Sequence, residues 1–209
     1  MDAAFLITAF VTLFVIIDPI GMTPLFVALT QGMSPARRRA IALRACVTSA
    51  LILIVFAAFG EQVLGFIGIS MPAFRIAGGI LLFLTALDML FERRSKRRQG
   101  QAEEAEDEDD NDDPSIFPLA IPLIAGPGAI ASVILLAGQR PHLEGLAMVI
   151  GVMLSVIAMV FVLFLTSGLL ERALGRVGIN VVTRLLGMLL AALAVQFVLD
   201  GLRGFGLAA

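Results

Sequence analysis

The sequence predicts an all-α membrane protein with six transmembrane helices, and three observations lead to this fold class. Hydrophobic residues make up 59% of the 209 residues, and the mean hydropathy is +0.98. Only 15% of the residues are charged, whereas ordinary soluble domains carry about 25%. The apolar residues form runs of the roughly 20 residues that are needed to cross a bilayer. An ordinary soluble domain is excluded, because so few polar groups cannot cover its surface.

Six apolar runs are the expected spans, and in order they are residues 4–29, 36–59, 72–91, 116–138, 145–169 and 182–202. We do not expect the first run to be a cleaved signal peptide, because no positive region precedes it and it continues past any cleavage point. Pro35 and Pro72 mark the starts of the second and third spans, since proline fits the first position of a helix.

A charged segment, Glu92 to Asp113, separates the third span from the fourth. It holds 5 of the 15 bases in a basic block, followed by 9 of the 17 acids in an acidic block. It has no apolar residue larger than alanine and cannot bury a core, so we expect a disordered cytoplasmic linker. A partner-binding tail or a charge-regulated latch is the alternative. The expected units are a first three-helix repeat, the linker and a second three-helix repeat, at residues 1–91, 92–115 and 116–209.

Lysine and arginine are unevenly distributed between the loops. The loops after the first, third and fifth spans hold ten of them, and the opposite face holds two, Arg140 and Arg203. Loops rich in lysine and arginine stay in the cytoplasm. We therefore expect both termini on the outer side of the membrane.

The two halves of the chain resemble each other. The first span contains Pro19 and Pro24, and the fourth contains Pro122 and Pro127, each pair five residues apart with glycine between them. Each half has three spans, an odd number, so the second half must enter the membrane from the opposite side. We expect two inverted repeats related by a pseudo-two-fold axis, an arrangement common in secondary transporters.

The paired prolines are expected to break the first and fourth spans near the membrane midplane, because proline inside a helix removes a backbone donor. Thr23-Pro24 and Gly126-Pro127 each match an N-cap followed by proline at the first helical position. Two half-helix N-termini would offer N–H groups to a carboxylate, and carbonyls freed nearby would take an ammonium group or a cation. The alternative is that the prolines only kink two packed helices.

Such a pocket suits a small zwitterion. The candidate substrate-binding residues surround the two breaks and are Asp18, Pro19, Gly21, Thr23, Pro24, Pro122, Gly126, Pro127 and Gly128. A charge inside a span is functional by default, so Asp18 either binds a coupling proton or sodium ion or contacts the substrate ammonium group. The other interpretation is a local turn in which its carboxylate accepts backbone N–H groups. The matching position of the second half is Ile121.

Arg75, Asp88, Arg184 and Asp200 form a second pattern, with an arginine near the start and an aspartate near the end of the third and sixth spans. If these spans are antiparallel neighbours, Asp88 would meet Arg184 and Asp200 would meet Arg75. The pairs are candidate gates. The alternative is structural pairing with interfacial snorkelling.

Cys46 and His142 are the only residues of their types. One cysteine and one histidine cannot build a disulfide or a zinc site, so we expect no metal centre and no cofactor. No basic stripe points to nucleic acid, and no plausible nucleophile–base pair points to an enzyme.

The segments DPIGMTPLF (residues 18–26) and PLAIPLIAGPGAI (residues 118–130) resemble the MarC family of bacterial inner-membrane proteins. The resemblance covers essentially the whole chain. It implies a place in the bacterial inner membrane and transport of small neutral amino acids such as glycine and alanine. Together with the repeat, it favours a secondary transporter that works by alternating access and is coupled to a proton or sodium ion. A passive channel, or an exporter of another small or amphiphilic solute, is the alternative.

Overall fold

A computed structural model describes residues 3–93, 113–140 and 142–207. The described residues form helices and connecting turns, and no strand is found among them. Most of the expected linker, residues 94–112, lies outside the described residues. The helices are α1 (Ala3–Ile17), α2 (Pro19–Leu29), α3 (Pro35–Phe66), α4 (Met71–Leu90), the irregular segment η1 (Ser115–Ile124), α6 (Pro127–Gly138), α7 (Leu143–Leu165) and α8 (Ser167–Gly204).

The helices agree with an all-helical membrane protein. Five segments are long and apolar enough to cross a membrane, or six when η1 and α6, which meet at a bend of 53°, count as one. Each predicted span coincides with one of these segments. The second span begins as predicted at Pro35, where the Ser34 hydroxyl accepts a hydrogen bond from the Arg37 N–H at 3.3 Å. This contact satisfies one of the backbone donors that a helix start leaves unpaired.

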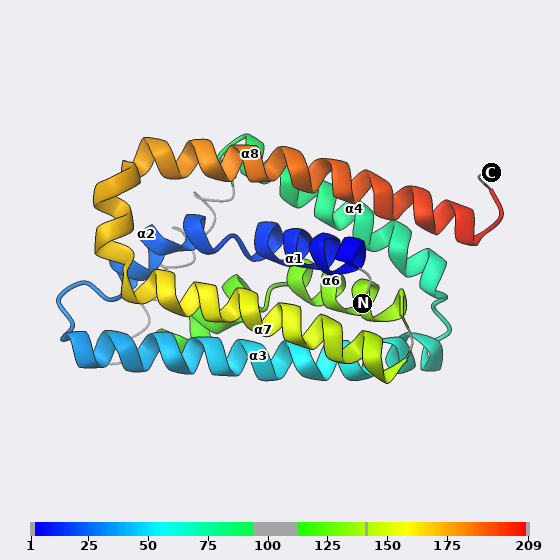
Figure 1. Ribbon diagram of the computed structural model, residues 1–209, viewed down its shortest axis with the longest axis horizontal. Helices are drawn as coiled ribbons and strands as arrows, with labels where there is room; N and C mark the ends of the chain where they lie inside the picture. The colour runs from blue at the N-terminus through cyan, green and yellow to red at the C-terminus, as the bar shows by residue number, and fades with distance from the viewer. Residues whose placement is uncertain (1–2, 94–112, 141, 208–209) are drawn as a thin grey trace.

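The helices form one elongated bundle in three layers (Figure 1). The pairs α4–α8 and α3–α7 lie outside, and α1, α2 and α6 lie between them. The start of α1 and the end of α8 lie toward the same end of the bundle, which we call the terminus end. The α2–α3 and α7–α8 connections lie at the opposite end, which we call the loop end.

The chain crosses the loop end in the first turns of α8. At Gly175 it turns to run along the bundle toward the terminus end (Figure 1). Gly175 has φ 61, a left-handed conformation that glycine adopts without steric cost.

The most extensive helix interface joins α4 to α8, the last helices of the two halves. A methyl group at Gly79 would lie 2.8 Å from the carbonyl oxygen of Ala194, and one at Gly201 would lie 2.9 Å from that of Pro72. Small residues allow helix backbones to approach closely in membranes. The third and sixth spans are therefore neighbours, and they run in opposite directions.

Candidate functional site

The helix of the first span is interrupted at Asp18. This residue has φ 57 and ψ 64, and a new helix starts directly after it at Pro19. Asp18 is only 1% exposed. Its Oδ1 accepts a hydrogen bond from the N–H of Gly21 at 3.1 Å. A Cβ added at Gly21 would fall on the Asp18 carboxylate. The carboxylate therefore caps α2, as in the local turn that was one of the two interpretations of Asp18.

The predicted N-cap at Thr23 is wrong. α2 begins at Pro19 and carries Pro24 in its interior. The Thr23 hydroxyl donates to the carbonyl of Pro19 at 3.0 Å, inside the helix. The physical reason is that Asp18 is the better cap, since its carboxylate accepts an N–H. Pro19 then occupies the first helical position, where no N–H is needed.

The fourth span is interrupted between η1 and α6. Gly126 is the N-cap of α6 and Pro127 is its first residue, as predicted. A Cβ at Gly126 would fall on the carbonyl oxygen of Pro122, so this close approach requires glycine.

The irregularity of η1 lies before its two prolines. Phe117 and Ile121 have extended backbones, with φ/ψ of −119/127 and −123/125, and each is joined to the following proline by a cis peptide bond. The turns are wide, because the N–H of Leu119 bonds the carbonyl of Pro114, five residues earlier, at 3.2 Å. Asp18 and Ile121, the matching residues of the two halves, are thus both non-helical and both precede a proline.

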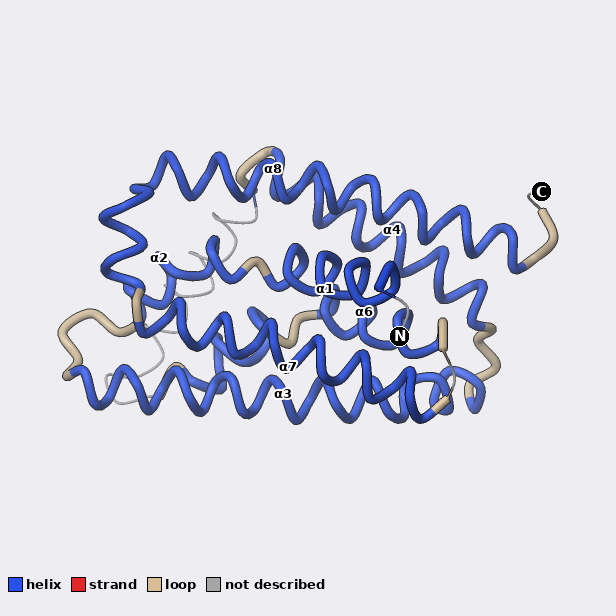
Figure 2. Tube along the Cα trace, in the orientation of Figure 1, coloured by secondary structure: helices blue, strands red, loops and turns tan. Residues whose placement is uncertain are grey.

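The two interruptions meet inside the bundle. Figure 2 shows them as short loop segments about midway along its length. A Cβ at Gly128, near the start of α6, would lie 2.8 Å from Cδ1 of Ile16, two residues before Asp18, and 3.8 Å from Leu82 of α4. The structure thus brings the two predicted motifs together through Ile16 and Gly128. Among the predicted substrate-binding residues, Pro127 differs from most of the others because it is exposed.

Two buried hydroxyl groups lie one turn from this contact. Thr12 is 0% exposed, and in the described part of the chain its Oγ1 has no hydrogen-bond partner. Ser132 is equally buried, and its hydroxyl donates to the carbonyl of Gly128 at 2.8 Å. α1 and α6 run in opposite directions, so both residues lie on the terminus-end side of the Ile16–Gly128 contact.

The candidate gate residue Arg184 donates a hydrogen bond to Glu92 at 2.7 Å. The sequence suggests Asp88 as its partner. Asn180 donates to the same carboxylate oxygen at 3.4 Å. Asp88 is half-buried one turn earlier on α4. Glu92 has φ 58, so the chain turns back just after α4 and brings this carboxylate to α8.

At the other end of the α4–α8 pair, the predicted partners Arg75 and Asp200 each make contacts with other residues. Asp200 accepts from Gln196 at 2.8 Å and pairs with Arg203 at 3.5 Å, both on α8. Arg75 donates to the carbonyl of Gly138 at 3.5 Å. A cation at the C-terminal end of α6 is favourable, because the last carbonyls of a helix lack partners within it.

A cluster at the loop end ties four helices together. Arg38 of α3 donates to the buried Ser167 hydroxyl at 3.0 Å, and its guanidinium lies 5.5 Å from the ring centroid of Phe26. Phe26 stacks on Phe164, with ring centroids 4.3 Å apart. The sequence gives no signal that relates these distant residues.

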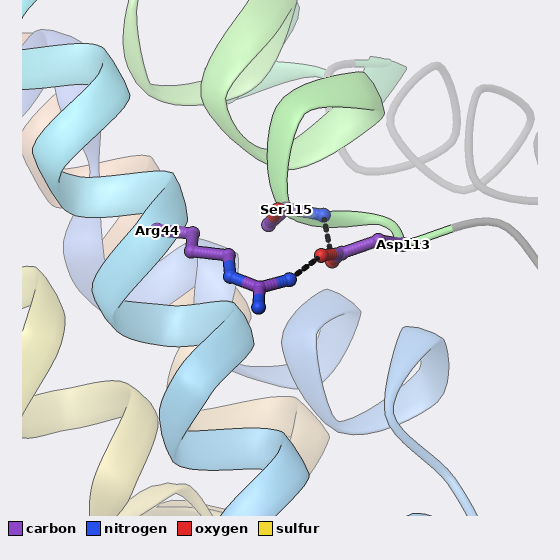
Figure 3. Close-up of polar contacts among 3 residues, drawn as sticks. All are labelled: Arg44, Asp113 and Ser115. Atoms are coloured by element: carbon purple, nitrogen blue, oxygen red, sulfur yellow. Dashed lines mark hydrogen bonds and ion pairs between the residues drawn. The ribbon is translucent and has the colours of Figure 1, made fainter.

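The start of the second half is fastened to α3 (Figure 3). Arg44 pairs with Asp113, and the same carboxylate accepts the N–H of Ser115 at 3.1 Å. Partial burial raises the pKa of Asp113, but the hydrogen bonds from Ser115 and Arg44 outweigh it and hold the pKa below its ordinary value of 3.8. The contact joins the chain just before η1 to α3.

An apolar cavity of about 380 Å³ lies beside the Asp18 interruption. It is lined by residues of α1, α2, α7 and the first turns of α8, namely Phe14, Ile20, Ala158, Met159, Val162, Leu163 and Leu170. Met159 and Val162 are 39% and 54% exposed, so the cavity opens on the outer surface of the bundle. Within the described ranges, no three His, Cys, Asp or Glu side chains gather as metal ligands do.

A family model described as MarC family integral membrane protein matches residues 3–205. The chain belongs to the MarC family. This confirms the resemblance that the two proline motifs indicated. The family description and the five or six candidate spans identify this MarC-family chain as an integral, multi-pass membrane protein.

The relatives of this MarC-family chain match it over nearly their full length. A UPF0056 membrane protein of Aquifex aeolicus is 41% identical over 94% of the chain and 92% of its own length. The UPF0056 membrane protein YvbG of Bacillus subtilis is 37% identical, with 98% and 97% covered. The UPF0056 inner membrane protein YhgN of Escherichia coli K12 is 38% identical, with 95% and 96% covered. No solved structure matches.

Proposed function

We propose that this protein is a secondary transporter of small neutral amino acids such as glycine and alanine. It works by alternating access between two inverted three-helix repeats. The observation that carries the proposal is that a non-helical residue lies directly before a proline at the matching position of each half, at Asp18 and at Ile121. Transporters commonly bind substrate where two such discontinuous helices meet.

The pattern of helix contacts supports the inverted repeat. Let α1, α2, α3 and α4 correspond to η1, α6, α7 and α8. Under this correspondence, the α3–η1 interface corresponds to the α1–α7 interface, and the α3–α6 interface corresponds to the α2–α7 interface. The α2–α8 interface corresponds to the α4–α6 interface. The α3–α7 and α4–α8 pairs map onto themselves, as expected of helices that flank a two-fold axis.

The chemistry around the interruptions supports a small zwitterionic substrate. The first turn of α6 supplies backbone N–H groups and the positive end of a helix dipole, which attract a carboxylate. Asp18 supplies a buried carboxyl group that could bind an ammonium group, a proton or a sodium ion. Ile16 packs closely against Gly128, so little space is left for a large substrate side chain.

We further propose that the protein lies in the inner membrane with its loop end in the cytoplasm and both termini outside. The loop end carries Arg37, Arg38, Arg39 and Arg172, whereas the terminus end carries Arg140 and Arg203. Such a bias sets orientation. The name of the Escherichia coli relative, an inner membrane protein, supports the location.

The test is uptake of labelled glycine and alanine into proteoliposomes under imposed proton or sodium gradients. We expect gradient-driven accumulation by the wild type and its loss in Asp18→Asn. Glu144→Gln is the matched control, because Glu144 is an exposed acid in the first turn of α7, and it should transport normally. Absence of accumulation under every gradient would refute the proposed function. Unchanged gradient dependence in Asp18→Asn would refute the role of Asp18.

Export of an amphiphilic solute is the second candidate, and the apolar cavity favours it. Phe14 and Ile20 connect the cavity to the Asp18 interruption, while Met159 and Val162 open it toward the surrounding hydrocarbon. A solute with an apolar tail would reach the interruption from the bilayer. Val162→Trp should fill the cavity, so efflux of an amphiphilic dye from proteoliposomes should fall while amino acid uptake stays unchanged.

A further inference from the structure

The two halves differ in how their first half-helices pack. α1 shares interfaces with α7, α6 and α8. Its counterpart η1 packs on α3, which corresponds to α7. In the described part of the chain, however, η1 shares no comparable interface with α2 or α4, which correspond to α6 and α8. The contacts that cover α1 are therefore not repeated around η1.

The exposure of matched residues shows the same difference. Aligning Pro19 with Pro122 pairs Leu13 with Ile116 and Asp18 with Ile121. Leu13 is 0% exposed, whereas Ile116 is 58% exposed. Asp18 is 1% exposed, whereas Ile121 is 44% exposed. Three apolar side chains of η1, those of Ile116, Phe117 and Ile121, are exposed, and we call them together the η1 surface.

We infer that the η1 surface is a docking surface for α2 and α4 of the same chain, and that it is covered in the opposite state of the transport cycle. The inference rests on the proposed function. α1 lies in the terminus-end half of the bundle, and Arg44 and Asp113 hold the start of η1 toward the loop end. The structure is thus closed around α1 at the terminus end and open around η1 at the loop end.

The inverted repeat gives the reason for this pairing. When two repeats have the same fold but different packing, exchanging their packing generates the oppositely facing state. η1 would then gain the contacts with α2 and α4 that α1 now makes with α6 and α8, and α1 would lose its own. α2 and α4 are the expected partners of the η1 surface because they correspond to α6 and α8, which contact α1 in the present state.

The test is the labelling rate of matched cysteines by a water-soluble maleimide. The background is Cys46→Ala, because Cys46 is the only cysteine of the chain. In proteoliposomes without substrate, we expect Ile116→Cys to react at least tenfold faster than Leu13→Cys. Gln31→Cys and Gln139→Cys, exposed in the α2–α3 and α6–α7 connections, report which end of the bundle the reagent reaches. Phe117→Cys and Phe14→Cys are a second matched pair, in case Leu13→Cys does not fold.

Several results would overturn the inference. The inference would be refuted by equal labelling rates within both pairs, or by faster labelling of the cysteines in α1. It would also be refuted if neither Ile116→Cys nor Phe117→Cys reacted, because the η1 surface would then face hydrocarbon. Labelling needs no amino acid substrate, so the two proposals fail separately. Unequal labelling without uptake would refute only the proposed function, and uptake with equal labelling would refute only the docking surface.

Discussion

Replacing Gly21 by alanine tests whether the Asp18 carboxylate determines where α2 begins. The added Cβ would fall on that carboxylate, so the carboxylate must rotate away and release the N–H of Gly21. The matched control is Gly151→Ala in α7, where no atom lies within 4 Å of the added Cβ. Both glycines lie within helices, so the gain in helix propensity, roughly 0.5–1 kcal/mol, is common to the two variants.

The difference between the two variants therefore measures the loss of the Asp18 contact. A hydrogen bond to a charged group contributes about 1.5–3 kcal/mol. We expect the free energy of unfolding of Gly21→Ala to lie about 1.5–3 kcal/mol below that of Gly151→Ala. The measurement is denaturation by sodium dodecyl sulfate of the protein in mild detergent micelles, followed by circular dichroism.

A double-mutant cycle decides whether the carboxylate is the cause. Asp18→Gly removes the carboxylate, and glycine accepts the left-handed backbone at this position. In that background Gly21→Ala should cost less than about 0.5 kcal/mol, because the coupling between the two positions is gone. An equal cost of Gly21→Ala in both backgrounds, or a cost as small as that of Gly151→Ala, would refute the capping role of the Asp18 carboxylate.

Three further predictions use the same unfolding measurement. Gly79→Ala should destabilise the protein by about 1–3 kcal/mol, because the added Cβ meets the α8 backbone; a neutral effect would contradict the close α4–α8 approach. Arg38→Gln should cost about 1–2 kcal/mol through its lost hydrogen bond and ring contact, and the exposed neighbour Arg39→Gln should be near neutral; equal effects would contradict the cluster. The pKa of Asp113 is lowered in the folded protein, so its contribution should be complete above about pH 5 and be lost as the pH falls below 3.8. Arg44→Gln should weaken this pH dependence, and an unchanged profile would contradict the contact.

The helices could be predicted from the sequence because the bilayer makes one dominant demand. About 20 apolar residues must satisfy their own backbone groups, and a helix does so. The interruption at Gly126 was also predictable, since no side chain competes with the backbone there. The interruption of the first span was misplaced, because Asp18 and Thr23 both suit an N-cap and spacing alone does not rank them.

The polar contacts between helices were less predictable, because they depend on where each helix ends. Arg184 meets Glu92 because the chain continues past Asp88 and then turns. Arg38, Phe26 and Phe164 come from three helices, and only the packed bundle brings them together. The apolar composition predicts that each of these segments is a helix. It does not determine how far one helix is shifted along its neighbour.

The α4–α8 interface has a consequence for biosynthesis. Gly79 of α4 packs against Ala194 of α8, which lies more than 100 residues later in the chain. At synthesis rates of about 5–20 residues per second, α4 would be inserted roughly 5–20 s before α8 leaves the ribosome. During that interval the glycine face of α4 is open to lipid or to another newly made chain. The time between insertion of the two halves is therefore the period in which this protein is most vulnerable to quality-control proteases and to mispairing with a second copy.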